Sequence, residues 1–296
     1  MIKTVSTAAI FILLYALLII PFTTCLRQKP FAEKLGYVPS VTALKTLAVD
    51  QKELVAVSLV LKVMMYYGGL IEKTENKVAI SPDYMSMSRL LHGAVKLDPY
   101  NMDAYYFAQS FLTWEVKQYK LANDLLDYGM KYRTWDWYLP FFAGFNSAFF
   151  LKDYAAAARY YQHAGELSGS DLSRLLAGRY MQESGQTELA IAYLTVMEKS
   201  ESNPALKKNY QLRLAAFRET LRIERARDSY LKTGGVLPTT VGRLISGGFL
   251  SPPPRDPYGG QFYLEADGKV ATTSKYAFAG VKNNSNPKAG EPDERH

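Results

Sequence analysis

The sequence has few of the residues that build covalent and metal-based sites. Among its 296 residues there is one cysteine, Cys25, and there are three histidines. A single cysteine cannot form an intrachain disulfide, so cysteine usage gives no sign of an oxidising compartment. The histidines, His92, His163 and His296, are far apart in the sequence, whereas a metal site needs three or four convergent ligands. We therefore expect no metal and no other cofactor.

The short motifs of common enzyme classes are also missing. The sequence contains no GxGxxG, GxxxxGK(S/T), HExxH, GxSxG or CxxC pattern, so it lacks the loops and ligand pairs on which nucleotide binding, hydrolysis and thiol exchange depend. Asp136 and Asp153 are too isolated to predict a general acid–base pair. We expect that the protein is not an enzyme.

Long runs of one charge are absent too. No five consecutive residues are Lys or Arg, and the formal net charge of +7 is spread along the chain. Nucleic-acid-binding domains usually concentrate their basic residues in a patch or stripe. We expect no nucleic-acid partner.

Apolar residues are abundant, and the first long apolar run lies at the N-terminus. Residues 4–26 contain no charged side chain. As a helix this segment rises about 34 Å, and a bilayer core is about 30 Å thick. A membrane anchor is the favoured interpretation. A cleaved signal peptide, a lipoprotein signal ending at Cys25 and a buried helix stay open, although Phe22-Thr23-Thr24 is not the usual lipoprotein box.

The sequence contains arguments for both orientations of this anchor in the membrane. Arg27, Lys29 and Lys34 follow the apolar run, and basic residues favour the cytoplasmic side. The layout of one early basic residue, an apolar core and a long following domain is typical of export, and long domains cross membranes whatever their flanking charge. We expect a single-pass inner-membrane protein with its body on the periplasmic side.

A repeated helical pattern organises the middle of the chain. Tyr154, Ala157, Tyr161 and Ala164 lie on one face of a predicted helix,. The same pattern recurs 35 residues earlier and 33 residues later, at Tyr119, Ala122, Leu126 and Gly129 and at Thr187, Ala190, Leu194 and Met197. A period near 34 residues with paired helices predicts a helical solenoid. Residues 204–232 form the longest helical pattern and suit the role of its capping helix.

These repeats resemble those of tetratricopeptide repeat proteins over about residues 82–200. Ala122, Ala157 and Ala190 match a small-residue position in the second helix of the family's repeat. The first helices match less well: their small-residue position is occupied by Ser110, Phe145 and Gly178, and Phe145 departs from the pattern. The resemblance implies stacked helix pairs and a groove lined by the first helices.

The resemblance also implies which side chains line that groove. The predicted partner-binding residues are Phe107, Phe111, Trp114, Phe142, Asn146, Phe149, Arg179 and Gln182. Some family members bind a peptide's terminal carboxylate in this groove, but only Asn146 and Arg179 fit that scheme. An apolar, aromatic groove is therefore expected, and such a groove suits an amphipathic helix or an apolar peptide.

Two further apolar segments have alternative interpretations. Residues 54–67 are apolar on nearly every side and are followed by Gly68-Gly69, which predicts the end of a helix. We expect this helix to be the first of the solenoid, with a second membrane span as the alternative. Residues 135–150 hold eight aromatic side chains, and core, protein interface and membrane surface are all open for them.

The C-terminal part changes from helical periodicity to Gly/Pro turns. Residues 239–246 predict a short helix, and strands at 261–265 and 270–273 flank a turn containing Asp267-Gly268,. Residues Leu237-Pro238, Asp256-Pro257, Gly259, Tyr263 and Asp267-Gly268 make this part resemble the C-terminal part of type II secretion major pseudopilins. That family often binds calcium through a later acidic loop, which is missing here, so calcium is not expected.

The expected fold is mainly α: a tetratricopeptide-like solenoid with an N-terminal transmembrane helix and a small α+β module. The predicted divisions are an anchor (1–27), a linker (28–40), the solenoid with its capping helix (41–233), the module (234–278) and a disordered tail (279–296). We expect a membrane-anchored interaction scaffold of the bacterial envelope that binds another envelope protein or peptide and serves pilus or secretion assembly. The alternative is a lipid- or small-ligand-handling protein, or an enzyme, with an aromatic pocket near Trp137 and Phe142.

Overall fold

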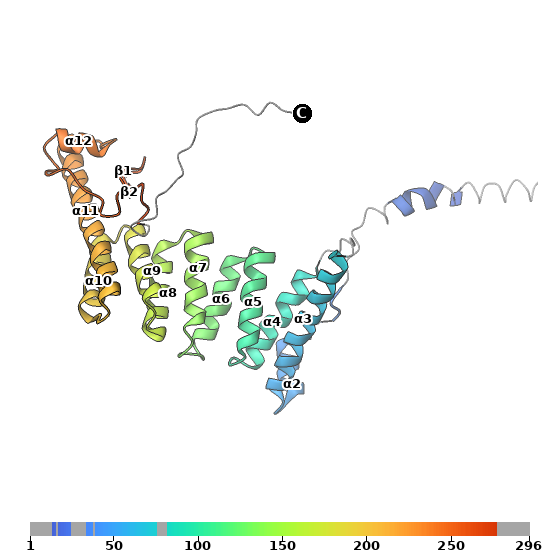
Figure 1. The fold of residues 1–296 in the computed structure, drawn as a ribbon. Helices are drawn as coiled ribbons and strands as arrows, with labels where there is room; N and C mark the ends of the chain where they lie inside the picture. The colour runs from blue at the N-terminus through green and yellow to red at the C-terminus, as the bar shows by residue number, and fades with distance from the viewer. Residues whose placement is uncertain (1–13, 16, 25–33, 38, 76–81, 277–296) are drawn as a thin grey trace, which may run out of the picture. The chain divides into compact units, whose positions relative to one another are not determined.

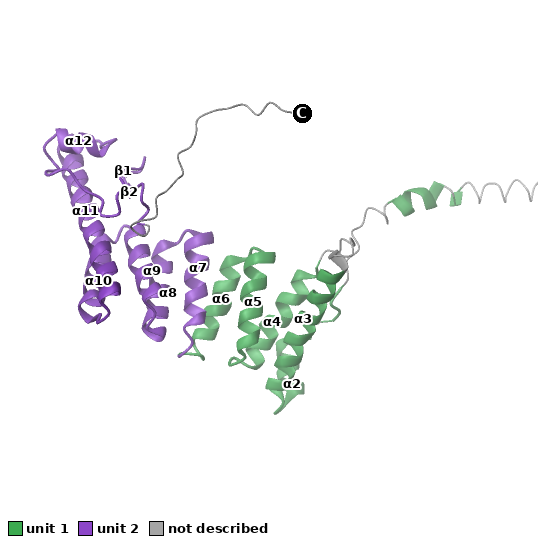
Figure 2. Ribbon diagram, viewed as in Figure 1, with its two compact units in different colours: residues 1–134 green, residues 135–296 purple. Residues whose placement is uncertain are grey.

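The computed structural model describes residues 14–15, 17–24, 34–37, 39–75 and 82–276. It divides into two compact units, residues 1–134 and residues 135–296 (Figure 2). Most of the predicted anchor and the whole predicted tail at 279–296 lie outside the described residues. Within the anchor, residues 17–24 are helical, and their large apolar side chains are exposed.

Unit 1 consists of helices that follow one another along the chain (Figure 1). Its elements are α2 (Val41–Ala48), α3 (Lys52–Glu75), α4 (Tyr84–Leu97), α5 (Met102–Ser110), η1 (Phe111–Glu115) and α6 (Tyr119–Met130). Helix starts are fixed by side-chain caps: Asp83 accepts from the Ser86 amide at 3.1 Å, and Asn101 accepts from the Ala104 amide at 3.0 Å. Such caps satisfy amides that the first turn leaves without partners.

The prediction that Gly68-Gly69 ends a helix is wrong, because α3 continues through both glycines to Glu75. Glycine in a helix interior costs about 1 kcal/mol relative to alanine. Packing beyond the glycines offsets this cost, since Leu70 is buried in the unit 1 core. Local propensity is overridden here by tertiary contact.

Unit 2 continues with helices that each pack against the next along the chain. Its helical elements are α7 (Tyr138–Asn146), η2 (Ser147–Leu151), α8 (Tyr154–Ser168), α9 (Asp171–Glu183), α10 (Thr187–Ser200), α11 (Pro204–Gly234) and α12 (Val241–Ser246). Ala157 and Tyr161 of α8 are buried in one core with residues of α9, α10 and α11, and Ala164 on the same face is buried as well. The predicted packing face of α8 is therefore confirmed.

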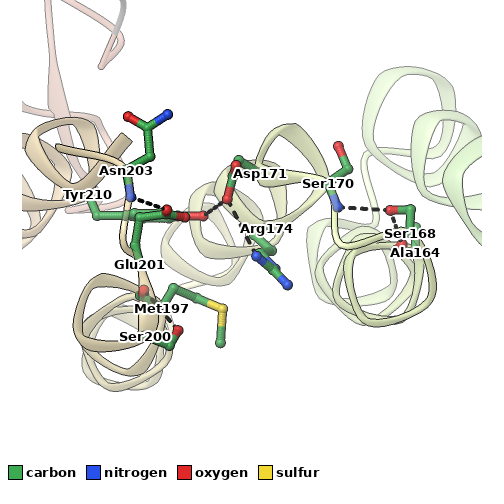
Figure 3. Close-up of polar contacts among 10 residues, drawn as sticks. All are labelled: Ala164, Ser168, Ser170, Asp171, Arg174, Met197, Ser200, Glu201, Asn203 and Tyr210. Atoms are coloured by element: carbon green, nitrogen blue, oxygen red, sulfur yellow. Dashed lines mark hydrogen bonds and ion pairs between the residues drawn. The ribbon is translucent and has the colours of Figure 1, made fainter. Parts of the chain in front are cut away.

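Polar contacts hold the connections of α8–α9 and α10–α11 at one end of these helices (Figure 3). The buried Tyr210 of α11 donates its hydroxyl hydrogen to Asp171 Oδ1 at 2.7 Å, and Arg174 lies 3.5 Å from the same oxygen. Burial and this carboxylate raise the pKa of Tyr210. Asp171 thus joins α11 to the start of α9 with its charge partly compensated.

The described part of the chain ends in a small helix and hairpin packed on the second half of α11. Strands β1 (Phe262–Leu264) and β2 (Val270–Thr272) pair antiparallel, with Phe262 opposite Thr272. The predicted turn between them is present, and Gly268 occupies the left-handed region at φ 84°, which favours glycine. We call residues 235–276 the C-terminal module; its buried residues share a core with Ile223 and Ala226 of α11.

A mainly α fold with helix pairs and a small α+β part confirms the predicted fold class. The basic residues of α11 do more than solvate its outer face. Arg222 Nη2 donates to the Pro252 carbonyl at 2.9 Å, and Arg227 Nη1 donates to the Gly268 carbonyl at 2.8 Å. They fasten the C-terminal module to the helix.

Candidate functional site: two differently covered grooves

The first helix of two predicted repeats ends in a π-helical turn. Segment η1 continues α5, and η2 continues α7. The α9 helix has no such turn within Asp171–Glu183. A π turn places one extra residue in a helix and often lies at functional sites. It also moves the side chains before and after it onto different faces, so groove positions cannot be transferred between repeats by spacing alone.

Unit 1 contains an apolar groove between α3 and α5. Its cavity has a volume of about 520 Å³. It is lined by Val57, Val60, Leu61, Met64, Asn101, Asp103, Tyr106, Phe107 and Ser110. Val57, Leu61 and Met64 are 46–55% exposed, and Asp103 is the one charged residue in this lining. We call this the α3–α5 groove.

The three predicted groove residues of unit 1 take different places. Phe107 lines the α3–α5 groove. Phe111 is buried behind it, stacked on Phe107 with ring centroids 6.4 Å apart and packed edge-on against Tyr67. Trp114 on η1 is 55% exposed and does not belong to the groove lining. Phe107 is thus a candidate contact for a partner, while the buried Phe111 packs against the Phe107 ring and holds it in position.

The sequence pattern missed the larger part of this groove, which comes from α3. Val57, Leu61 and Met64 follow each other at helical spacing on α3, beside the buried Val60 that lines the same groove. The available signal was the apolar character of residues 54–67 on every side, because a helix buried on one face only should carry polar residues on the other. An exposed apolar stripe of this kind is typical of an interaction surface.

In unit 2 the predicted groove residues lie in two settings. Asn146 is fully buried and engaged within the fold, while Phe142 is half-buried against Tyr138, with ring centroids 4.2 Å apart. Phe149 is exposed, with Lys152 Nζ 5.3 Å from its ring centroid. Of these three side chains, Phe149 is the one available to a partner.

The other two predicted residues, Arg179 and Gln182 of α9, face the C-terminal module. Both line a cavity of about 150 Å³ whose opposite wall is formed by the hairpin and by Tyr276. Lys269 closes one side: its Nζ donates to Glu183 Oε2 at 2.7 Å and lies 5.3 Å from the Tyr154 ring centroid. The groove positions of α9 are therefore covered by the chain itself.

The aromatic segment 135–150 is divided between core and surface. Leu139 and Ala143 are buried, and Phe141 packs edge-on against Tyr161 at 5.5 Å. Trp135 and Trp137 are exposed. The cavities described here are lined by other residues than Trp137 and Phe142, so the aromatic-pocket alternative gains no support from them.

The length and composition of α3 would allow it to span a membrane. Of the described residues, Lys52–Glu72 make the one helix that is long and apolar enough to cross a bilayer, with a mean hydropathy of 1.9, and 28% of that window is buried. Core helices of soluble proteins meet the same criterion. Within the described part of the chain, no group of three His, Cys, Asp or Glu side chains is placed to hold a metal ion.

Comparisons with known proteins give one kind of similarity. No family model matches the chain, and no curated protein matches it in sequence. Among solved structures, the chain is similar to YrrB, described as a TPR protein with an unusual peptide-binding site, at 18% identity and a TM-score of 0.37. The similarity covers 61% of this chain and 86% of that one.

Proposed function

We propose that this protein is a membrane-anchored scaffold that binds another protein of the bacterial envelope through the α3–α5 groove. The observation that carries the proposal is the groove itself. It is open and lined mainly by half-exposed apolar side chains. The groove positions on α9, by contrast, are covered by the C-terminal module of the same chain. The body lies on the periplasmic side, and the scaffold serves pilus or secretion assembly.

The chemistry of the groove favours an amphipathic helix as the bound element. Val57, Leu61 and Met64 present an apolar strip about two turns long, and Phe107 faces it from α5. Apolar residues of a partner helix spaced by three and four positions fill such a groove. Asp103 is exposed at the lining and favours a basic residue beside the apolar anchors of the partner.

The membrane and envelope parts of the proposal rest on the chain's two ends. Residues 17–24 are helical with exposed apolar side chains, as expected for a segment that contacts lipid. The C-terminal module has the helix, turns and hairpin on which the resemblance to secretion pseudopilins was based. Both features support a scaffold held at the membrane among secretion or pilus components.

Site-specific photo-crosslinking of the full-length protein in its native membrane tests the groove. A photoreactive amino acid at Met64 is expected to capture one discrete partner, while the same probe at Met85 is expected to capture none. Met85 is also an exposed methionine of unit 1, but it lies on α4 outside the groove. Capture of the same proteins from both positions would contradict the proposal.

Once the partner is known, its affinity measures the contribution of the groove. Met64→Asp is expected to weaken binding by about 30-fold, since loss of a central apolar anchor costs about 2 kcal/mol or more. Met85→Asp is expected to leave the affinity unchanged. Equal affinities for wild type and Met64→Asp would exclude this groove as the binding site.

The predicted orientation has its own test. Protease added outside spheroplasts is expected to remove the body of the protein and leave a protected N-terminal fragment. A body that is degraded only after the membrane is permeabilised would place it in the cytoplasm and refute the periplasmic assignment, without bearing on the groove.

A further inference from the structure

Polar atoms without partners gather where α9 and α11 meet the C-terminal module. Arg179 Nε, Gln182 Oε1, and Arg213 Nε and Nη1 are buried, and none has a hydrogen-bond partner among the described residues. Each unsatisfied buried group costs about 1–3 kcal/mol. Such groups are rare in native proteins, and a cluster of them indicates a bound water or ion.

Two of these residues bring positive charge without an ion pair. Arg179 and Arg213 form no ion pair with any described carboxylate. Burial, and further the nearby Arg179 charge, lower the pKa of Arg213. The Arg213 guanidinium lies 5.3–5.9 Å from the ring centroids of Tyr258, Tyr276 and Phe217. Aromatic faces stabilise a cation, and Tyr258 also shares a hydrogen bond with Arg213, but Nε and Nη1 of Arg213 are left without a partner.

The cavity beside Arg179 keeps a positive balance after its internal ion pairs are counted. It is lined by Arg179, Gln182, Glu183, Lys269 and Lys275, and also by Glu265. Glu183 is neutralised by Lys269 at 2.7 Å, and Glu265 is exposed to solvent, which screens its charge. Lys275 is exposed as well, so its charge is screened in the same way, and Arg179, with its buried Nε and no ion pair, is the charge left without a counter-charge in this lining.

The cavity has room for a small ion. Its volume is about 150 Å³, several times the share of about 30 Å³ that one water takes in the liquid. Gln182 is 2% exposed, and its unpaired Oε1 needs a hydrogen-bond donor, while Arg179 Nε–H needs an acceptor. A protonated oxyanion offers both: charged oxygens for the arginine and an O–H for the amide.

We propose that this cavity binds a protonated oxyanion of the hydrogen-phosphate class, which joins α9 to the C-terminal module. Arg179 donates to the anion, Gln182 accepts its O–H, and Arg213 adds positive charge from behind Tyr276. The site is separate from the α3–α5 groove and does not depend on the proposed function.

Thermal unfolding of the full-length protein in detergent tests this site, in low millimolar inorganic phosphate against chloride of equal ionic strength. Wild type is expected to gain Tm as phosphate increases, following mass action for a ligand that binds the folded state. Arg179→Gln is expected to bind phosphate at least about tenfold more weakly, since the anion loses a charged donor. Arg213→Gln is expected to bind phosphate more weakly as well, because it removes positive charge near the cavity. Arg218→Gln, at an exposed arginine of the same helix, should respond as wild type does.

The Tm measured in chloride, without phosphate, distinguishes a variant that has lost the anion site from one that has lost its fold. Without phosphate, Arg213→Gln is expected to be at least as stable as wild type, because it removes an unpaired buried charge. Sulfate should raise Tm less than phosphate, since it has no proton for Gln182 at neutral pH. No phosphate effect on wild type, an equal effect on Arg213→Gln, or an equal effect of sulfate would overturn the proposal.

The acidic residues Glu291, Asp293 and Glu294, outside the described part, are an alternative source of negative charge. If phosphate stabilises only a variant with all three replaced by glutamine, the chain itself supplies the anion, and the proposal of a free oxyanion is overturned. If wild type and this variant respond alike, the proposal is supported. Hydrogen exchange in β1 and β2 should slow on phosphate addition, because the anion fastens the hairpin.

Discussion

Gly178 of α9 leaves room for the Leu194 side chain of α10, and its replacement by alanine tests this packing sharply. An added Cβ would lie 2.7 Å from Leu194 Cδ2 and 2.8 Å from Leu194 Cγ. Leu194 is fully buried, so it cannot swing into solvent. Because the contact includes the branch carbon as well as a methyl tip, relief requires α9 and α10 to separate or Leu194 to leave its rotamer.

The expected sign follows from two opposing terms. Overpacking of a filled core costs about 1–3 kcal/mol, and contact with a branch carbon belongs to the upper half of that range. Alanine in a helix interior gains about 1 kcal/mol over glycine. We therefore expect Gly178→Ala to destabilise unit 2 by about 1–2 kcal/mol.

Gly68→Ala is the matched control. Gly68 lies inside α3 and has nothing within 4 Å of an added Cβ, so only the helix term remains, and a gain of about 0.5–1 kcal/mol is expected. Hydrogen exchange resolved by peptide suits a chain of two units, since it reports each region's opening free energy separately. Exchange should quicken in α9 and α10 for Gly178→Ala and slow in α3 for Gly68→Ala.

A double-mutant cycle with Leu194→Ala isolates the contact. Leu194→Ala alone should cost about 2–5 kcal/mol through its cavity. In the double variant the new Cβ no longer clashes and fills part of that cavity, so a coupling of about 1 kcal/mol or more is expected. If Gly178→Ala stabilises α9, or if the effects of the two changes are additive, Gly178 and Leu194 are not packed as closely as the structure places them.

Three more changes test the C-terminal part of unit 2. Burial raises the pKa of Glu224, so its ionised form is disfavoured in the fold, and stability should fall as pH rises from the unfolded pKa through the folded one. Glu224→Gln should raise Tm at neutral pH and flatten that part of the pH profile. Lys269→Met should speed hydrogen exchange in the hairpin by about tenfold, because its ion pair is half-buried, while Arg225→Met, in an exposed pair, should change nothing measurable,. Tyr276→Phe should cost about 1 kcal/mol in urea unfolding by removing a buried 2.8 Å hydrogen bond to Thr220,; an unchanged midpoint would contradict that bond.

The second helices of the repeats could be predicted because their pattern is local. Ala157, Tyr161 and Ala164 are spaced for one helix face, and all three are buried. The first helices could not be aligned by spacing. A Cβ added at Gly144 would lie 3.1 Å from the Tyr161 ring, seventeen positions along the chain, whereas a Cβ added at Gly178 would meet Leu194, sixteen positions along.

The π turn η2 explains this difference of one residue. It adds a residue between Gly144 and α8, so the small residue that admits the second helix stands one position earlier than the family pattern expects. Phe145 therefore departs from that pattern without disturbing the packing. An i→i+5 turn has no simple sequence signature, since its residues Ser147–Leu151 are as compatible with an α-helix.

The sequence could not predict that the C-terminal module covers the groove positions of α9, and the reason is different. Lys269 meets Glu183 across 86 positions of sequence, and no periodicity relates the two. Arg179 and Gln182 were predicted as groove positions on a first helix, and the side chains opposite them come from the C-terminal module. Local pattern predicts which way a side chain faces, and only the tertiary fold shows what it meets.

The function proposed above implies a partner that binds the α3–α5 groove weakly in solution and is concentrated there by the proposed membrane anchor. Covering four half-exposed apolar side chains, Val57, Leu61, Met64 and Phe107, contributes about 1 kcal/mol each, and a complementary partner face contributes a similar amount. Association costs at least about 4 kcal/mol, which leaves about 4 kcal/mol, or a Kd near 1 mM. Two proteins held in one membrane reach effective concentrations of that order. Removal of the anchor should therefore abolish the complex even though no groove residue changes, and a complex that survives its removal at micromolar concentration would show that other surfaces dominate binding.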